Sequence, residues 1–266
     1  QWKVLGQALN DRAFLQELIS QGVALLGRLY LPEVDGTWQD GKLGEFLRLV
    51  KADPQYMAAW YADKLLGHPN NDLITAWESP NEPFGEMHVG PDPLLAPRYD
   101  FFMAALTGMM ARKDKGVVVG NMGSGAWNDL RFSSHFPRTA ILGPRWGHHE
   151  YGWPHIYDQQ PRHAFSHLKI EWPAPVVLTE VGVTKAVDGQ GPDVGFFADG
   201  LDRDPEVYTT MLIDYEKQIQ AESAFLFLTG AAQDWVERGF ESTEVLRAVY
   251  VGTRGKGLGR PRAVKT

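Results

Sequence analysis

Short apolar runs recur along the chain, and polar loops and amphipathic segments separate them. Runs such as Val117–Gly120 and Val176–Thr179 are almost continuously apolar, which is typical of strands covered on both faces, as in a parallel sheet wrapped by helices. In all, the sequence predicts seven strands: Trp2–Leu5, Val23–Tyr30, Leu73–Trp77, Val117–Gly120, Thr139–Leu142, Val176–Thr179 and Ala224–Leu228.

Helices are predicted in the segments between these strands. Asn10 or Asp11 can cap a helix that Gly22 ends. Pro97 stands at the first turn of another, and Asp204 begins a third. Strand–helix alternation of this kind indicates an α/β fold.

We therefore predict an α/β protein with a (β/α)8 TIM-type barrel, formed as a single domain over residues 1–266. Barrels of about 250 residues commonly form one domain. Because only seven strands are recognisable, one strand is atypical or missing from the pattern. It is either hidden between Glu45 and Leu66, or it lies before residue 1. An open doubly wound sheet is the alternative arrangement.

Composition removes several classes of function. The formal charge of −7 argues against a nucleic-acid partner, which would require a basic surface. The absence of cysteine excludes disulfides, thiolate metal sites and cysteine nucleophiles. No apolar run approaches the roughly 20 residues of a membrane span, so we expect no membrane partner.

Two glutamates follow predicted strands at positions that suit catalysis. Strand Leu73–Trp77 runs into a loop that contains Glu82, and strand Val176–Thr179 runs directly into Glu180. The carboxyl ends of barrel strands line the active-site mouth. The interval of 98 positions from Glu82 to Glu180 corresponds to about three βα units, which places the two glutamates across the mouth from each other. Cleavage of a glycosidic bond requires two carboxylates that face one pocket.

The segments around these glutamates resemble those of a known family. Trp77–Pro83, which reads Trp-Glu-Ser-Pro-Asn-Glu-Pro, resembles the Asn-Glu-Pro signature after strand four in the clan A glycoside hydrolases. Leu178–Gly182 resembles the nucleophile motif after strand seven of that clan, and His148–Gly152 is similar to its strand-six segment. The order along the chain also agrees, and the resemblance covers residues 73 to 228.

The resemblance implies a retaining hydrolase that cleaves a β-linked poly- or oligosaccharide by double displacement. Glu180 would be the nucleophile and Glu82 the acid/base. Asn81 would bind a sugar hydroxyl, Tyr151 would orient Glu180, and Arg28 is the candidate for the arginine that the clan places near its nucleophile. Two carboxylates about 5 Å apart repel by roughly 3 kcal/mol, or about two pKa units, so only one ionises readily near neutral pH.

Further substrate contacts are expected from histidine and tryptophan side chains. His149 is a candidate hydrogen-bonding partner of the substrate. Trp153 and Trp235, with Trp127 and Trp146, are candidates to stack on sugar rings, although each is equally suited to packing. The platform tryptophan that the clan carries at the end of strand eight has no counterpart in residues 225–230.

The mechanism implied by the resemblance uses side chains and water, so no cofactor and no metal is expected. A carbohydrate substrate is the expected partner. An extracellular or cell-surface location is expected only from where such substrates occur, and the sugar, the linkage and the oligomeric state are open.

Other interpretations of the same residues stay open. Glu82 and Glu180 can be ordinary loop carboxylates, and Glu78 and Glu86 compete with Glu82 for the acid/base role. A carbohydrate-binding pseudoenzyme on the same barrel is the second hypothesis. A metal-dependent hydrolase that uses His148 and His149 is the third, although adjacent residues of a strand point to opposite sides.

Overall fold

The computed structural model of the chain describes residues 2–5, 9–29, 42–81, 83–84, 94–123, 129–151, 166–182, 184–185, 194–195 and 223–226. The chain divides into two compact units. The first comprises residues 1–150, 169–180 and 221–225, and the second comprises residues 151–168, 181–220 and 226–266. Within the second unit, β7 (Thr184–Lys185) and β8 (Val194–Gly195) form an antiparallel ladder.

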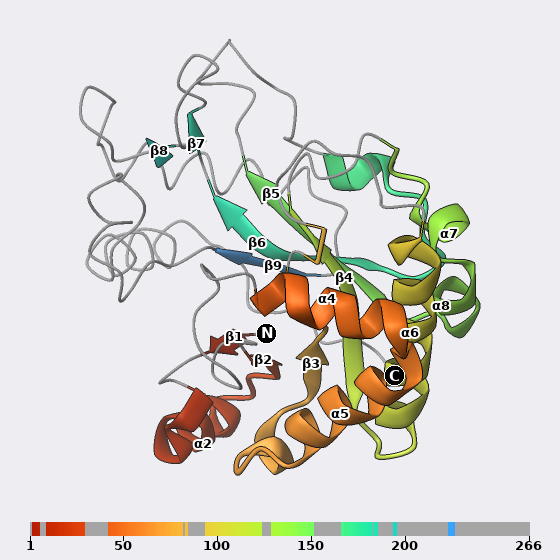
Figure 1. Cartoon of the computed structure of the whole chain (residues 1–266). Helices are drawn as coiled ribbons and strands as arrows, with labels where there is room; N and C mark the ends of the chain where they lie inside the picture. The colour runs from red at the N-terminus through yellow and green to blue at the C-terminus, as the bar shows by residue number, and fades with distance from the viewer. Residues whose placement is uncertain are drawn as a thin grey trace. The chain divides into compact units, whose positions relative to one another are not determined.

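A seven-stranded sheet carries the fold, and its strands follow one another in chain order. They are β1 (Trp2–Leu5), β2 (Leu25–Arg28), β3 (Ala76–Glu78), β4 (Gly116–Met122), β5 (Arg145–Tyr151), β6 (Val176–Gly182) and β9 (Ser223–Leu226). Strands β1 to β5 pair in parallel and curl into half a barrel (Figure 1). The predicted α/β class and the parallel sheet are therefore confirmed, and sequential parallel strands are what successive βα units produce.

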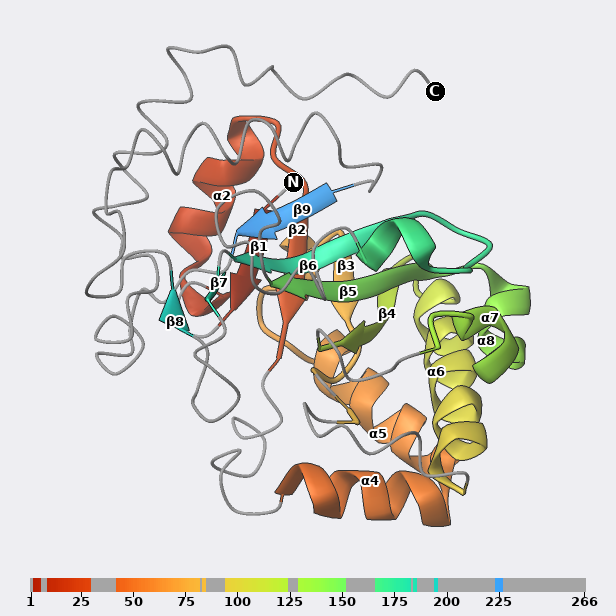
Figure 2. The same cartoon turned by 90° about the horizontal axis from the view of Figure 1, so that it is seen from above.

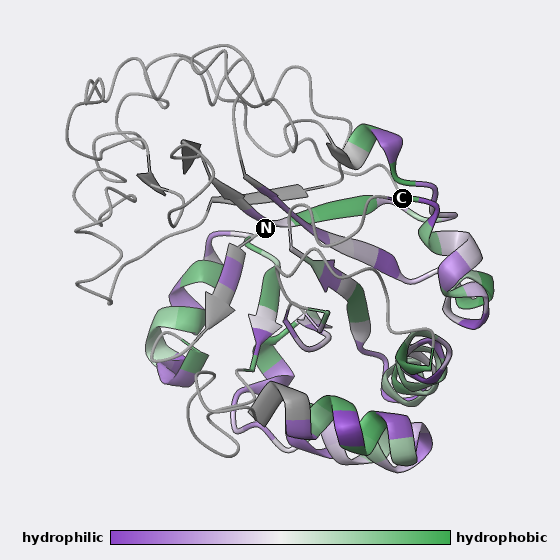
Figure 3. Ribbon diagram, turned by 45° about the horizontal axis from the view of Figure 1, so that its top comes forward, coloured by the Kyte–Doolittle hydropathy of each residue, from purple (hydrophilic) through white to green (hydrophobic). Residues whose placement is uncertain are grey.

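Helices cover the outer face of this curled sheet (Figure 2). They are α2 (Arg12–Ser20), α4 (Lys42–Ala52), α5 (Pro54–Leu66), α6 (Leu95–Ala111), α7 (Phe132–His135) and α8 (Pro137–Leu142). The chain also has two 3-10 turns, η2 (Asn71–Leu73) and η3 (Ser166–Lys169). Hydrophobic and hydrophilic residues alternate along several of these helices, as expected when one side packs on a sheet (Figure 3). Among the described residues, no helix is both long and apolar enough to cross a membrane.

Local sequence explains where several helices begin. The Asp11 carboxylate accepts a hydrogen bond from the Phe14 backbone N–H at 3.0 Å, which confirms the predicted cap of α2. Asp53 caps α5 in the same way, with Pro54 at its first position. Pro97 lies in the first turn of α6, as predicted.

The two faces of the sheet have separate hydrophobic clusters. Val117 and Val119 of β4 belong to the large core between the sheet and the helices, whereas Val118 belongs to a small cluster with Leu26, Val177 and the partly buried Ala76. Successive side chains of a strand point to opposite faces, so this small cluster marks the inner face.

The same alternation places charged residues on the inner face. Arg28 lies two residues after Leu26 on β2, and Glu78 lies two residues after Ala76 on β3. Both follow the inner cluster towards the carboxyl ends of their strands. On β2 and β3, the inner face of the sheet is therefore apolar towards the amino ends of the strands and charged at their carboxyl ends.

One predicted strand is wrong. Thr139–Leu142 forms α8 and not a strand. Pro137 occupies the first turn of this helix, and the buried Asp100 carboxylate accepts hydrogen bonds from the backbone N–H groups of Arg138 and Thr139. The β-branched residues favoured a strand locally, but the proline and the cap supplied by α6 favour the helix.

Other strand predictions change in place or number. No strand lies between Glu45 and Leu66, because α4 and α5 occupy that segment. The strand predicted at Leu73–Trp77 begins only at Ala76, after the 3-10 turn η2. Strand β5 was missing from the seven strands predicted by apolar runs, because histidines and a glutamate interrupt its apolar pattern.

Trp146 packs in the core, so its assignment to the mouth is wrong. Its side chain is fully buried, with its ring 4.4 Å from the ring of Phe132 and 4.6 Å from that of Trp172, between ring centres. Trp127 lies outside the described residues.

The close approach of Trp77 to β2 gives a test of this packing. A Cβ on Gly27 would lie 2.7 Å from the buried Trp77 ring and 3.0 Å from Ile74 Cγ2. We expect Gly27→Ala to lower the free energy of unfolding by about 1–3 kcal/mol, because the indole cannot move without disturbing the core. Urea denaturation measures the change.

Gly108→Ala is the matched control, because its new Cβ would meet nothing closer than 3.9 Å inside α6. This change should leave the protein as stable or slightly more stable. Equal stability of the two variants would show that Trp77 is not packed as described.

Candidate active site

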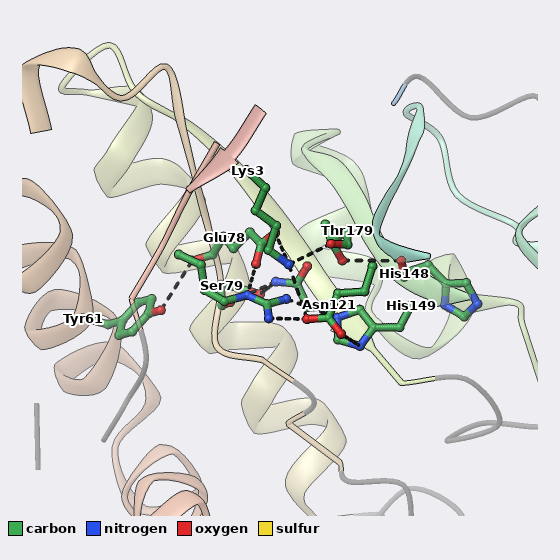
Figure 4. Close-up of polar contacts among 10 residues, drawn as sticks. Lys3, Tyr61, Glu78, Ser79, Asn121, His148, His149 and Thr179 are labelled. Carbon is green, nitrogen blue, oxygen red and sulfur yellow. Dashed lines mark hydrogen bonds and ion pairs between the residues drawn. The ribbon is translucent and has the colours of Figure 1, made fainter. Parts of the chain in front are cut away.

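Five charged or polar side chains from five strands meet on the inner face of the sheet. They are Lys3 of β1, Arg28 of β2, Glu78 of β3, His149 of β5 and Glu180 of β6 (Figure 4). Each is almost completely buried: the exposed fraction of the side chain is 7% for Lys3 and for Glu180, and lower for the others.

Arg28 holds this cluster together. Its Nε donates to Glu78 Oε2 and its Nη1 donates to Glu180 Oε1. Its Nη2 lies 3.3 Å from His149 Nε2. All three guanidinium nitrogens of Arg28 therefore make contacts, and these contacts fix the orientation of both carboxylates relative to the guanidinium plane.

Lys3 is the second cation of the cluster. Its Nζ donates to the Thr179 carbonyl oxygen at 2.7 Å, and it lies 3.3 Å from Glu78 Oε1 and 3.4 Å from Glu180 Oε1. Burial lowers the pKa of Lys3, and the charge of Arg28 acts in the same direction, whereas Glu78 and Glu180 raise it. The ammonium therefore depends on its two carboxylate partners to remain charged.

The charges in the cluster balance when all four groups are ionised. Each of the two carboxylates, Glu78 and Glu180, contacts both cations. Burying a charge without a partner is costly, and removal of one partner from a buried pair is far more damaging than loss of a surface pair. The four side chains therefore form one electrostatic unit.

His149 connects Arg28 to the second oxygen of Glu180. A guanidinium N–H can only donate, so the His149 Nε2 that faces Arg28 is the acceptor, and the proton of the neutral ring is on Nδ1. That Nδ1 lies 3.4 Å from Glu180 Oε2. The two oxygens of Glu180 consequently differ: Oε1 contacts two cations, and Oε2 faces a neutral imidazole.

Asn121 fixes the chain that leaves β3 towards the predicted signature. It has a left-handed backbone, with φ of 48°, where the pairing of β4 with β5 shifts. Its Nδ2 donates to the Ser79 carbonyl oxygen at 2.9 Å, and the Ser79 N–H donates to the Val118 carbonyl oxygen. Only glycine fits at position 147, since a Cβ there would lie 2.0 Å from Asn121 Oδ1.

Three of the residues proposed from sequence lie together: Glu180, Arg28 and His149. Asn81 follows β3 and is half-buried, and its buried Oδ1 accepts no hydrogen bond from the described residues. Glu82, Trp153 and Trp235 lie outside the described residues. Tyr151 ends β5, but its side chain is not part of what the structure describes.

Sequence reasoning missed Lys3 and gave Glu78 a different part. A signal for Lys3 exists in the sequence, because it is a lysine inside the short and otherwise apolar strand predicted at Trp2–Leu5. Glu78 was considered as an alternative to Glu82. In the structure both of its oxygens face cations, which suits an ionised acceptor and not a proton donor.

The two adjacent histidines do not face the same point. Their rings lie on opposite sides of β5, with His149 towards Arg28 (Figure 4). Within the described residues, no group of three or more His, Asp or Glu side chains is arranged to hold a metal ion.

Comparisons with known proteins do not place the chain in a family. No protein-family model matches the sequence, and no curated protein matches it at a significant level. Its function must therefore be argued from its own motifs and geometry.

The buried charge balance can be tested through Glu78. Glu78→Gln keeps the shape but leaves Arg28 and Lys3 with one carboxylate, so we expect a loss of about 3–5 kcal/mol in the free energy of unfolding. Chemical denaturation near neutral pH measures it.

Glu45→Gln is the control, because it removes the carboxylate from the exposed ion pair between Glu45 and Arg48. The free energy of unfolding should change little. A Glu78→Gln protein as stable as the wild type would mean that Glu78 carries no charge in the folded protein.

Proposed function

We propose that this protein is a retaining glycoside hydrolase with Glu180 as the nucleophile and Glu82 as the acid/base. The observation that carries the proposal is the environment of Glu180. It lies in the buried cluster, where Oε1 contacts the cations Arg28 and Lys3 and Oε2 lies 3.4 Å from His149 Nδ1. A double-displacement nucleophile must be ionised and held in a fixed position before it attacks.

The order of the strands agrees with the proposed pairing. Strand β3 leads into Asn81 and Glu82, and β6 carries Glu180, so the two segments are three strands apart in the sheet. The family motifs that they resemble are separated by the same number of strands. We take β1 to β6 and β9 as seven strands of a (β/α)8 barrel whose carboxyl ends form the active-site mouth.

In the first step, the Glu180 carboxylate attacks the anomeric carbon of a β-linked sugar while Glu82 protonates the leaving glycosidic oxygen. In the second step, Glu82 takes a proton from water, and the water oxygen replaces Glu180 at the anomeric carbon. Asn81 suits the role of binding a sugar hydroxyl, because its Oδ1 has no partner among the described residues. Tyr151, Trp153 and Trp235 are proposed as further contacts, from the sequence alone.

Glu78 is excluded from the acid/base role in this proposal. Its side chain is fully buried, with Oε2 accepting from Arg28 and Oε1 facing Lys3. A proton donor to the leaving group needs a protonated oxygen that can reach the substrate. We assign to Glu78 the role of orienting the Arg28 guanidinium, so that its Nη1 can donate to Glu180.

The test is hydrolysis of a panel of β-linked polysaccharides by the wild type, Glu180→Gln and Glu82→Gln. We expect the wild type to cleave at least one glycan, and each variant to lose about 10²–10⁴-fold in rate or more. Proton NMR of the first-formed product should show the β configuration, because double displacement retains it.

Glu171→Gln serves as the matched control, since Glu171 is exposed and should not affect the rate. Unimpaired glutamate variants of an active wild type would mean that other carboxylates act. Binding of a glycan without cleavage would favour the pseudoenzyme, and loss of activity with a chelator would favour a metal-dependent hydrolase.

A further inference from the structure

We propose that Lys3 is a positioning residue that keeps Glu180 ionised through its contact with Oε1, and that it promotes release of the sugar from Glu180. The part of this proposal that concerns catalysis rests on the proposed function. The part that concerns the charge of Glu180 rests on the geometry of the cluster alone.

The backbone and the side chain of Lys3 are both fixed by contacts with neighbouring strands. It lies in β1, where its backbone pairs with Leu26 of β2, and its Nζ is tied to the Thr179 carbonyl oxygen at 2.7 Å. That carbonyl belongs to the residue just before Glu180. The lysine thus contacts both the backbone and the carboxylate of the segment that carries the proposed nucleophile.

Lys3 is one of two cations that contact Glu180 among the described residues. The facing groups are Lys3 from β1, Arg28 from β2, Glu78 from β3 and His149 from β5. Lys3 and Arg28 each contact both Glu78 and Glu180, and removal of one cation from beside buried carboxylates favours uptake of a proton by them. Lys3 supplies the second positive charge that allows both to be ionised.

The contacts also distinguish the two oxygens of Glu180. Oε1 accepts from Arg28 Nη1 and lies 3.4 Å from Lys3 Nζ, so its lone pairs are directed at cations. Oε2 lies 3.4 Å from His149 Nδ1. Lys3 therefore acts on Glu180 through Oε1, the same oxygen that Arg28 contacts.

The effect of Lys3 differs between the two chemical steps. In the first step Glu180 gives an electron pair to the anomeric carbon and its negative charge disappears, so Lys3 does not accelerate the step beyond keeping the carboxylate ionised. In the second step the bond from the Glu180 carboxylate to the anomeric carbon breaks, the electron pair returns to Glu180, and water supplies the new oxygen and gives its proton to Glu82. Lys3 stabilises the charge that reappears.

The first experiment follows the charge of Glu180 directly and does not depend on any substrate. Carboxyl carbons of glutamate are labelled with ¹³C, and the signal of Glu180 is identified by its absence in Glu180→Gln. We expect Lys3→Met to move the titration of this signal upward by about 1–2 pH units, because a positive charge 3.4 Å away has been removed. Lys3→Arg should keep the titration near that of the wild type.

Two controls separate charge from structure. Lys115→Met removes another lysine whose Nζ donates to backbone carbonyl oxygens, those of Asn71 and Ile74. Lys115 lies before the first residue of β4, away from the site, so this variant should leave the titration of Glu180 unchanged. The double variant Lys3→Met with Glu78→Gln restores the balance of one cation to one carboxylate, and should bring the titration back towards the wild type.

The titration tests the role of Lys3 even if one variant does not fold. If Lys3→Met alone is unfolded, the comparison is made between Glu78→Gln and the double variant, and the signal of Glu180 must titrate higher in the double variant. An unmoved titration in either comparison overturns the proposal and leaves Lys3 as a packing residue.

The second experiment measures kinetics with the dinitrophenyl β-glycoside of the sugar that the panel identifies. This leaving group makes the first step fast, so release of the sugar limits kcat. We expect Lys3→Met to lower kcat and KM together by about tenfold. At pH values where Glu180 is ionised in the variant, kcat/KM should be preserved. A fall in kcat/KM with unchanged KM would contradict the proposed role. If no glycan is cleaved, the proposed function fails, while the titration still decides the role of Lys3.

Discussion

The contact of Arg28 with two buried carboxylates is the interaction on which the site depends. It joins β2 to β3 and to β6 through one planar group, so these strands must keep fixed distances from one another. The enclosure that makes each ion pair strong also makes each unpaired charge costly. Lys3 completes the balance from β1, and the site therefore requires the ordered packing of strands that are far apart in sequence.

The sheet supplies that order by a simple alternation. Residues on the outer face, such as Trp77 and Val117, pack under the helices, while their neighbours in sequence point into the half-barrel. Gly27 leaves room for the Trp77 ring between strands. Packing on the outer face thereby sets the register and separation of β2 and β3, which carry Arg28 and Glu78. Residues far from the site therefore control its geometry.

Sequence predicted the class of fold and part of the site for physical reasons that the structure makes clear. Apolar runs identify strands buried on both faces, which is why β4 and β6 were found, but β5 was not, because polar site residues interrupt its pattern. Thr139–Leu142 was misassigned because its cap comes from Asp100 on another helix. Glu180 and Arg28 were found by motif, whereas the contacts of Lys3 depend on tertiary structure that no local pattern encodes.

The span of these contacts along the chain has a consequence for folding. Lys3 and Glu180 are 177 residues apart, and Arg28 and Glu180 are 152 residues apart. Contacts with such large sequence separation form slowly, because a long loop must close before they are gained. The ion pairs of the site therefore form after most of the sheet has assembled, and a chain emerging from the ribosome must wait for β6 before its first strand has a complete set of partners.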